Sequence, residues 1–248
     1  MRRLADRFAD LAAQCPSLDE LRTLLGDACK ELGFEYFALL HHASLTSDSS
    51  RFLRIDNYPE PWVRTLIDSG FAGDDPVHLA SRRASAGFAW SEIGSLIRLT
   101  SRHQSILAGG RRFGLEDGFT VPVNVPGEPS GSCSFALRDG RDLSPIRLSC
   151  AEIIGAEAFK AARRLRASQI TRLRPHLSKR ERECVRLVAL GKSDWEIGVI
   201  PGISAETARQ YVKRARLAYG VASRTQLAVC ALYDGWIDFN DVGPKAAR

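Results

Sequence analysis

The chain has 248 residues, 44% of them hydrophobic, and a formal net charge of +6 at pH 7, so it is long enough for one large or two medium domains. We expect a cytoplasmic protein and exclude an integral membrane protein, because no apolar run could cross a membrane and no signal peptide precedes the first expected helix. The six cysteines are widely scattered and form no C-x-x-C pair, which excludes a disulfide framework and a cysteine-ligated zinc site and indicates a reducing compartment.

The positive charge is concentrated in the last third of the chain. Residues 163 to 248 hold 17 Lys and Arg against 8 Asp and Glu, whereas residues 1 to 162 hold 18 against 21. A basic excess can neutralise phosphate groups, so this asymmetry favours nucleic-acid binding by the C-terminal part. It also fits a solvated basic surface, and a motif is needed to choose between the two.

The first part of the chain mixes helices and strands. Apolar residues at helical spacing and capping signals predict helices over residues 1–13, 17–33, 59–69, from 76, over 100–113 and over 144–166. Aromatic and aliphatic runs predict strands over residues 34–42, 51–58, 118–125 and 131–137. The apolar stripe of the last helix comprises Ile146, Ile153, Ile154 and Phe159. We therefore expect residues 1–166 to form one antiparallel sheet with helices on both faces.

Five residues near the ends of these elements have the chemistry of a small-molecule pocket: Tyr58, Trp62, Asp75, Trp90 and Ser134. Indole N–H, hydroxyl and carboxylate groups can together fix a polar head group inside an apolar cavity. Residue chemistry alone favours a simpler interpretation, in which the two tryptophans are core residues and Asp75 caps the helix that follows it.

His41 and His42 could suggest a metal site. Adjacent strand residues point to opposite faces of a sheet, however, and no other ligand cluster accompanies them. We therefore expect no metal, and we expect this strand end to face solvent.

The polar residues 167–176 are expected to be a linker to a second domain over residues 177–248. Serines begin four helices in this domain, with capping-box spacing at Ser178-x-x-Glu181, Ser193-x-x-Glu196 and Ser223-x-x-Gln226 and a further cap at Ser204. A Pro-Gly break between the second and third helices predicts an all-α, four-helix domain with a helix-turn-helix. The expected core comprises Val185, Leu187, Val188, Leu190, Trp195, Ile197, Ile203, Val212, Leu217, Leu227 and Val229.

The third of these helices, residues 204–217, is strongly basic. It carries Arg209, Lys213, Arg214 and Arg216, and positions 209, 213 and 216 share one face. A helix of this width fits the DNA major groove, where Arg and Lys can hydrogen-bond to guanine O6 and N7. The sequence therefore predicts a DNA-binding helix.

Two groups of motifs resemble known sequences. LSKREREC, ALGKSDWEIG, GIS, ET and GV-x-SRTQLAV resemble the LuxR-type DNA-binding domain, and NYPEPW, DDPV, F-x-W, GFTVPV and GSCSFAL resemble the autoinducer-binding domain of LuxR-type quorum-sensing regulators. The resemblance implies an α+β protein, with an N-terminal α/β/α sandwich followed by a four-helix helix-turn-helix domain. It also implies a transcription factor rather than an enzyme, with an N-acyl homoserine lactone as ligand and with no cofactor.

The resemblance assigns a role to each pocket residue. Trp62 would donate its indole N–H to the lactone carbonyl, and Asp75 would accept the amide N–H of the ligand. Tyr58 and Ser134 would hydrogen-bond to the acyl carbonyl, and Trp90 would wall the lactone ring. Each polar atom of the ligand would then meet one buried partner.

The chain departs from the family at Leu66, one helical turn after Trp62, where many relatives have a second Tyr. The change removes an aromatic wall and a hydroxyl group near the acyl chain. We therefore expect the acyl group to be branched or aryl rather than a plain straight chain.

On the DNA side, Arg209 and Lys213 match the positions that contact base edges in the family. The residues expected to contact phosphates are Lys192, Ser204, Thr207, Arg214 and Arg216. One such helix reads only a few base pairs, so a homodimer on a palindromic operator is expected.

A second hypothesis keeps the DNA-binding domain and makes the first domain a phosphorylation receiver of a two-component response regulator. Asp56-x-x-Pro59 after a strand gives this hypothesis slight support. A receiver also needs paired acidic residues after its first strand, where this chain has His-Ala-Ser. An enzyme is not expected, because no G-x-S-x-G, P-loop or Rossmann glycine pattern is present.

Overall fold

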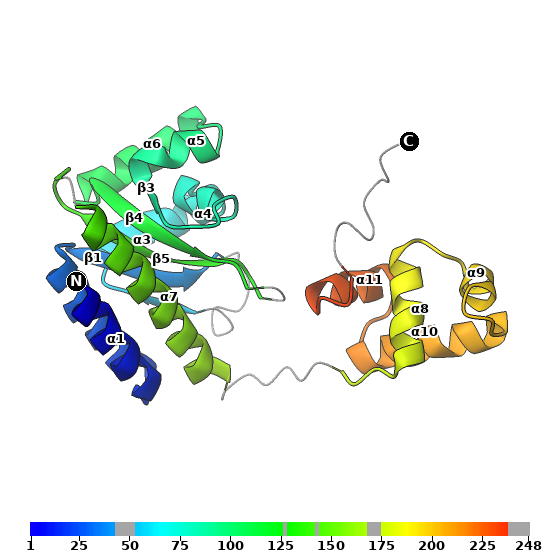
Figure 1. Cartoon of the computed structure of the whole chain (residues 1–248). Helices are drawn as coiled ribbons and strands as arrows, with labels where there is room; N and C mark the ends of the chain where they lie inside the picture. The colour runs from blue at the N-terminus through cyan, green and yellow to red at the C-terminus, as the bar shows by residue number, and fades with distance from the viewer. Residues whose placement is uncertain (43–52, 126–127, 142–143, 168–174, 238–248) are drawn as a thin grey trace. The chain divides into compact units, whose positions relative to one another are not determined.

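The computed structural model describes residues 1–42, 53–125, 128–141, 144–167 and 175–237. The chain divides into two compact units, the first ending at Thr171 and the second holding Arg172–Arg248. Figure 1 shows the helices and strands of both units. Most of the expected linker, residues 168–174, lies outside the described residues, so the exact domain boundaries stay a prediction.

The first unit is built on an antiparallel sheet, with five strands in its described part in the order β2-β1-β5-β4-β3. The strands are β1 (Tyr36–His41), β2 (Arg54–Asp56), β3 (Phe88–Ala89), β4 (Asp117–Val123) and β5 (Gly131–Leu137). The expected hairpin forms, with β4 paired to β5. The strand expected over residues 51–58 is shorter, at Arg54–Asp56, and residues 51 and 52 lie outside the described part.

Helices cover both faces of this sheet, as expected (Figure 1). The face that carries Phe37, Leu39 and Phe135 packs against α1 (Arg2–Gln14), α2 (Leu18–Leu32) and α7 (Pro145–Ala167). Elements on the opposite face are α3 (Glu60–Asp68), α4 (Pro76–Ser81), α5 (Ile93–Leu96) and α6 (Ser101–Arg112), with 3-10 turns η2 (Phe71–Gly73) and η3 (Trp90–Glu92). Because successive strand residues point to opposite faces, Ala38 and Ser134 lie on this second face. The α/β/α sandwich is confirmed.

The apolar stripe predicted for α7 is wrong in half of its residues. Ile154 and Phe159 are buried, but Ile146 and Ile153 are 63% and 50% exposed. Small residues such as Gly155 face the sheet instead. A Cβ atom at Gly155 would lie only 2.9 Å from Cγ2 of Val121. The helix approaches the sheet too closely there for larger side chains.

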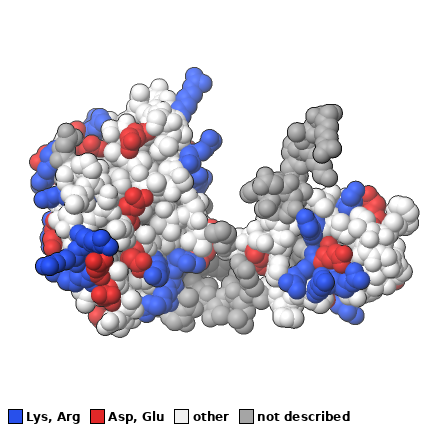
Figure 2. Space-filling view, viewed as in Figure 1, with Lys and Arg blue, Asp and Glu red and all other residues white. Residues whose placement is uncertain are grey.

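The second unit is all-α in its described part. Its helices are α8 (Lys179–Ala189), α9 (Asp194–Val199), α10 (Ala205–Tyr219) and α11 (Arg224–Tyr233). All four expected serine caps are present. Three are reciprocal capping boxes, whereas Ser204 instead shares a hydroxyl–hydroxyl contact of 2.8 Å with Thr207. On the visible face of this unit, Lys and Arg side chains surround a small cluster of Asp and Glu side chains (Figure 2).

The core of the second unit is smaller than the sequence predicted. Val185, Leu187, Val188, Ile197, Val212 and Leu227 are buried, and Ile203 packs against them. Leu190, Trp195, Leu217 and Val229 are exposed, contrary to expectation. The core is completed by small residues, among them Cys184, Ala208, Ala215 and Ala231, which let the helices pack closely.

Candidate ligand pocket and DNA-binding helix

A cavity of about 400 Å³ lies on the second face of the sheet in the first unit. This volume is in the range of small-molecule sites. All six residues expected to contact the ligand line it: Tyr58, Trp62, Leu66, Asp75, Trp90 and Ser134. The remaining wall is largely apolar, with Ala38, Leu40, Leu53, Val63, Val77, Ile106, Leu107 and Leu115 among its residues. Segments up to about 100 residues apart therefore converge on one cavity, as residues 38 and 134 do.

The polar groups of Tyr58 and Trp62 are available to a ligand. Within the described residues, no hydrogen bond engages the Tyr58 hydroxyl or the Trp62 indole N–H, although both side chains sit in the pocket wall. Burial, followed by the charge of Asp75, raises the pKa of Tyr58 well above its usual value. The phenol therefore stays protonated and can donate a hydrogen bond.

Asp75 caps helix α4, so the simpler interpretation of this residue is also right. Its Oδ1 accepts the backbone N–H of Val77 at 2.8 Å. Its Oδ2 is 3.8 Å from Nε2 of His78, which is too long for a hydrogen bond. Asp75 thus lines the cavity with acceptor capacity remaining after it has capped the helix.

Trp90 and Ser134 are joined through Thr120, a residue that the sequence analysis missed. The Trp90 indole donates to Oγ1 of Thr120 at 2.9 Å, and the Thr120 and Ser134 hydroxyls lie 2.9 Å apart. Thr120 and Ser134 are directly opposite each other on β4 and β5. The chain of contacts fixes the Trp90 ring plane and the Ser134 hydroxyl together. Cross-strand register, which one sequence does not reveal, creates it.

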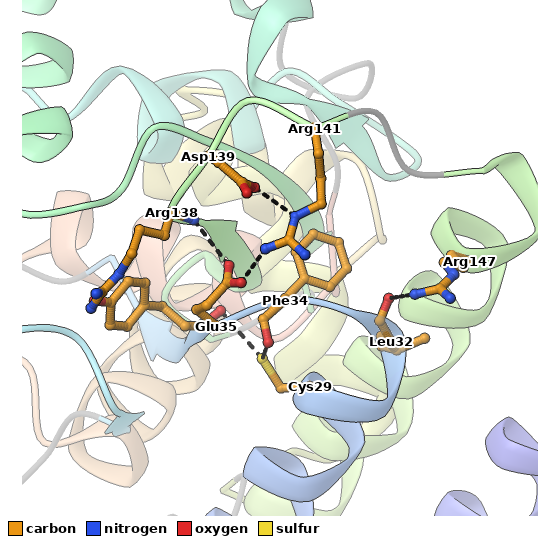
Figure 3. Close-up of polar contacts among 9 residues, drawn as sticks. Cys29, Leu32, Phe34, Glu35, Arg138, Asp139, Arg141 and Arg147 are labelled. Atoms are coloured by element: carbon orange, nitrogen blue, oxygen red, sulfur yellow. Dashed lines mark hydrogen bonds and ion pairs between the residues drawn. The ribbon is translucent and has the colours of Figure 1, made fainter.

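The start of β1 is tied to the end of β5 by polar contacts (Figure 3). The Arg138 backbone N–H donates to Oε2 of Glu35 at 3.0 Å, and Arg141 forms an ion pair with the same carboxylate. The thiol of Cys29 is 3.4 Å from the Tyr36 carbonyl, and burial raises its pKa to about 12. This thiol is a structural donor. The contacts hold the β1–β5 register that places Ala38 opposite Ser134 in the pocket.

Two glycines of α6, also missed from the sequence, make room for Trp62. A Cβ atom at Gly109 would lie 2.8 Å from Cζ3 of the indole, and one at Gly110 would lie 3.6 Å from Cζ2. The indole therefore lies directly against the helix backbone, and its position depends on the missing side chain at residue 109.

We expect Gly109→Ala to weaken ligand binding about tenfold or more, because the added methyl group must displace the Trp62 indole. The unliganded protein should lose at most about 2 kcal/mol of stability, because overpacking costs about 1–3 kcal/mol and alanine favours a helix by about 1 kcal/mol over glycine. Titration of the purified variant checks this. Gly26→Ala in α2 is the matched control, since its Cβ would be 3.5 Å from Phe37, an ordinary contact. Equal affinities of the two variants would contradict the prediction.

The far part of the cavity carries histidines that the sequence analysis did not expect there. His42 is buried rather than facing solvent, with Nε2 2.8 Å from Oγ of Ser132 and its ring stacked on His78 at 4.3 Å. Burial, followed by the charges of His78 and Arg82, lowers the pKa of His42 to about 2, so it is neutral. Among the residues the structure describes, no group of three or more His, Cys, Asp or Glu could hold a metal ion.

The seven residues expected to contact DNA all lie in or near the helix-turn-helix. Lys213 and Arg214 are exposed on α10, and no ion pair involves them in the described part of the chain. Arg209 pairs with Glu206 at 2.8 Å and with Asp194 at 3.5 Å. The other four also have intramolecular contacts: Lys192 with Glu196, Ser204 with Thr207, and Arg216 with the Ala222 carbonyl. Lys213 and Arg214 are therefore the cations of this group that can meet a new partner without breaking an ion pair or a side-chain hydrogen bond in the described part of the chain.

The turn between α9 and α10 depends on Gly198, which was not singled out from the sequence. The Ile203 N–H donates to the Gly198 carbonyl at 2.8 Å. A Cβ atom at residue 198 would be 2.9 Å from the Ile203 carbonyl oxygen and 3.0 Å from the Ala205 nitrogen. Backbone atoms form this contact, so they cannot yield as a flexible side chain would. Only glycine fits at this crossing.

Comparisons with known proteins agree with both units. The family described as the autoinducer binding domain matches residues 17–165, and the family described as bacterial regulatory proteins, luxR family, matches residues 175–231. The transcriptional activator VanR of Vibrio anguillarum is 28% identical, covering 91% of this chain and 94% of its own. LuxR of Aliivibrio fischeri is 26% identical, covering 94% of each. The crystal structure of Escherichia coli SdiA has a similar fold, with a TM-score of 0.70, 24% identity, and 94% of this chain and 97% of that chain covered.

The receiver hypothesis is wrong. A receiver has a doubly wound parallel sheet, whereas each strand pairing in the described part of the first unit is antiparallel. Of the helices that the structure describes, none is both long enough and apolar enough to cross a membrane. The two matched families bind an autoinducer of the acyl-homoserine lactone type and DNA, and they are transcription factors rather than enzymes. The chain belongs to the LuxR family of autoinducer-binding transcriptional regulators.

Proposed function

We propose that this protein binds an N-acyl homoserine lactone with a branched or aryl acyl group and, as a cytoplasmic homodimer, controls quorum-sensing promoters. The observation that carries the proposal is the convergence of six expected contact residues on one cavity of about 400 Å³. Two of them, Tyr58 and Trp62, present donors that no described residue engages. A lactone ring, an amide and an acyl carbonyl supply the matching acceptors and donor.

Each pocket residue has one role in this proposal. Trp62 donates to the lactone carbonyl, and Tyr58 and Ser134 hydrogen-bond to the acyl carbonyl. Asp75 accepts the amide N–H through Oδ2, because its Oδ1 is already used by the Val77 N–H. Trp90 closes the wall beside the lactone ring, in the orientation set by its bond to Thr120.

Leu66 supports a bulky acyl group. It lines the cavity and packs beside Trp62 in the same apolar cluster. A leucine offers this part of the pocket no hydroxyl group and no flat ring, so shape alone selects what lies against it. Competition binding should rank branched or aryl lactones above long unbranched ones. Highest affinity for a long unbranched lactone would count against this assignment.

Helix α10 reads DNA in this proposal. Arg209 and Lys213 contact base edges, and Lys192, Ser204, Thr207, Arg214 and Arg216 contact phosphates. Arg209 must first exchange its ion pairs with Glu206 and Asp194 for a base edge. Arg216 reaches phosphate only if it releases the Ala222 carbonyl, so its contribution is expected to be the smaller one. Two copies on a palindromic operator would double the number of base pairs read.

We expect Arg209→Ala and Arg214→Ala to affect DNA binding differently. Arg209→Ala should cost about 1–3 kcal/mol on the preferred operator and relax the preference at one base of each half-site. Arg214→Ala should weaken binding to all sequences alike and reduce the slope of log affinity against log salt concentration by about one for each phosphate that the arginine neutralises. Binding to an operator library at several salt concentrations measures both. Equal losses on every sequence for both variants would contradict the assignment of Arg209 to base edges and Arg214 to phosphates.

A further inference from the structure

The cavity runs along strand β1 from the expected head-group site to a pair of stacked histidines. Ala38 and Leu40, which share one face of β1, line the cavity, and so do His41 at the end of the strand and His42 just after it. Ala38 lies opposite Ser134, and Leu40 lies opposite Ser132, whose hydroxyl contacts His42 at 2.8 Å. Two strand residues span about 7 Å. An acyl chain that starts at Ser134 and follows β1 therefore reaches Ser132, and the edge of the His42 ring that contacts it, about 7 Å beyond its carbonyl, although the His42 backbone lies farther along, beside Ser130.

The two histidines are only partly satisfied. His42 is 8% exposed, and its Nδ1 is enclosed with no hydrogen-bond partner in the described part of the chain. Nδ1 of His78 is likewise enclosed and has no hydrogen-bond partner among the described residues. A buried polar atom without a partner is unfavourable, so such atoms in a ligand cavity are candidates for ligand contacts. A purely alkyl tail would leave both nitrogens without a partner.

The other polar groups near this part of the cavity do not need a contact with the acyl tail. Arg54 and Asp56 also line it, but they form an ion pair with each other at 2.7 Å. Asp75 lies 3.8 Å from Nε2 of His78; its Oδ1 accepts the Val77 N–H, and its Oδ2 is the acceptor of the ligand amide in the proposed function. We therefore expect the histidine pair to select the functional group that the acyl tail carries.

The chemistry of the pair selects a hydroxyl group. A neutral imidazole has one N–H donor and one acceptor nitrogen. The Ser132 hydroxyl can donate to Nε2 of His42 or accept from it, so Nδ1 is the donor in one tautomer and the acceptor in the other. A carbonyl on the ligand pairs only with an N–H. A hydroxyl group donates and accepts, so it pairs with either tautomer of the neutral His42 ring.

We infer that the acyl group of the lactone carries a hydroxyl group about 7 Å beyond its carbonyl, which hydrogen-bonds to the stacked His42–His78 pair. This inference rests on the proposed function, because it assumes that a lactone occupies the head-group site. It adds the class of ligand, a hydroxylated acyl homoserine lactone, and assigns its recognition to two residues outside the head-group site.

The test compares two matched ligand pairs on the full-length protein by titration. One pair is the 6-hydroxyhexanoyl and hexanoyl lactones, and the other is the 3-(4-hydroxyphenyl)propanoyl and 3-phenylpropanoyl lactones. Wild-type protein should prefer the hydroxylated member of at least one pair about tenfold, the ratio that corresponds to one buried hydrogen bond. The pair that shows the larger ratio distinguishes an alkyl from an aryl tail.

The same ratio is measured in His42→Phe and His78→Phe, which keep a flat ring but lose the nitrogens. Each ratio should fall toward one. His176→Phe makes the same change at an exposed histidine of the second unit and should keep the wild-type ratio. Each ratio compares two ligands on the same variant, so a general loss of affinity cancels. The test can be made with whichever of the two variants folds.

Lactone binding without any preference for a hydroxyl group would overturn this inference and leave the proposed function intact. A preference that persists in both phenylalanine variants would also overturn it. Failure of every lactone to bind folded wild-type protein would overturn the inference and the proposed function together.

Discussion

Asp75→Ala should weaken lactone binding about 100-fold and lower the free energy of unfolding of the first unit by about 1 kcal/mol. The affinity loss follows from removing an ionised acceptor of the ligand amide, since hydrogen bonds to charged groups contribute about 1.5–3 kcal/mol. The stability loss follows from removing the cap on the Val77 N–H, because N-cap substitutions by alanine cost about 1 kcal/mol. Titration and thermal unfolding of the same preparation measure the two effects.

Two further substitutions separate the effects at this position. Asp75→Ser keeps a capping oxygen but is too short to serve both the helix and the ligand, so it should restore stability while affinity stays low. Asp75→Asn keeps the cap and the length but loses the charge, and should bind roughly tenfold more weakly than the wild type. If the serine variant bound as tightly as the wild type, Asp75 would be a helix cap alone and its role at the ligand would be refuted.

Gly198→Ala should destabilise the second unit by roughly 2–3 kcal/mol, because its Cβ would press on the backbone of Ile203 and Ala205. In a domain of this size each kcal/mol corresponds to about 4–8 °C in melting temperature, so the second unit should melt about 8–24 °C lower. DNA affinity should fall with it, because the contact sets the turn between α9 and α10. Ligand binding by the first unit should be unchanged.

Val199→Ala is the matched control for Gly198→Ala. Val199 is the next residue of α9 and is 59% exposed, so its truncation should change stability by less than about 0.5 kcal/mol. Calorimetry of the full chain with and without lactone resolves the transition that the ligand shifts from the one that it does not. A Gly198→Ala protein with both transitions at wild-type temperatures would show that the turn tolerates a side chain.

Local signals explain why the helix-turn-helix could be predicted so closely. A capping box such as Ser193-x-x-Glu196 is complete within four residues, and the structure confirms it with the Glu196 N–H 3.3 Å from the Ser193 hydroxyl. Burial in the same domain was harder to predict. Trp195 is 68% exposed because α9 is only six residues long and buries one side, through Ile197 and Gly198. Hydrophobic identity does not specify which side of a short helix faces the core.

In the pocket, too, features that depend on local sequence were predicted and features that depend on distant contacts were not. Ser134, Trp62 and Asp75 were predicted as ligand contacts because the motifs around them resemble the autoinducer-binding domain, and each motif is complete within a few residues. The sequence analysis missed His42, which lines the pocket, and Thr120 and Gly109, which position lining residues. Their importance comes from neighbours 14 to 90 residues away, such as Ser134 for Thr120 and Ser132 for His42. Such contacts depend on the register between strands and on the depth of helix packing, which a single sequence does not encode in any local pattern.

The most direct test of the central claim is thermal unfolding of the full-length protein against a panel of N-acyl and N-aryl homoserine lactones. A ligand at 100 times its Kd adds about 2.7 kcal/mol to the stability of the unit that binds it. We expect a selective rise in melting temperature of several degrees, reduced in Trp62→Phe, which lacks the indole N–H, and kept in Trp195→Phe, which changes an exposed tryptophan. No rise with any lactone from folded protein would contradict the account, and the cavity would then be assigned to another class of small molecule.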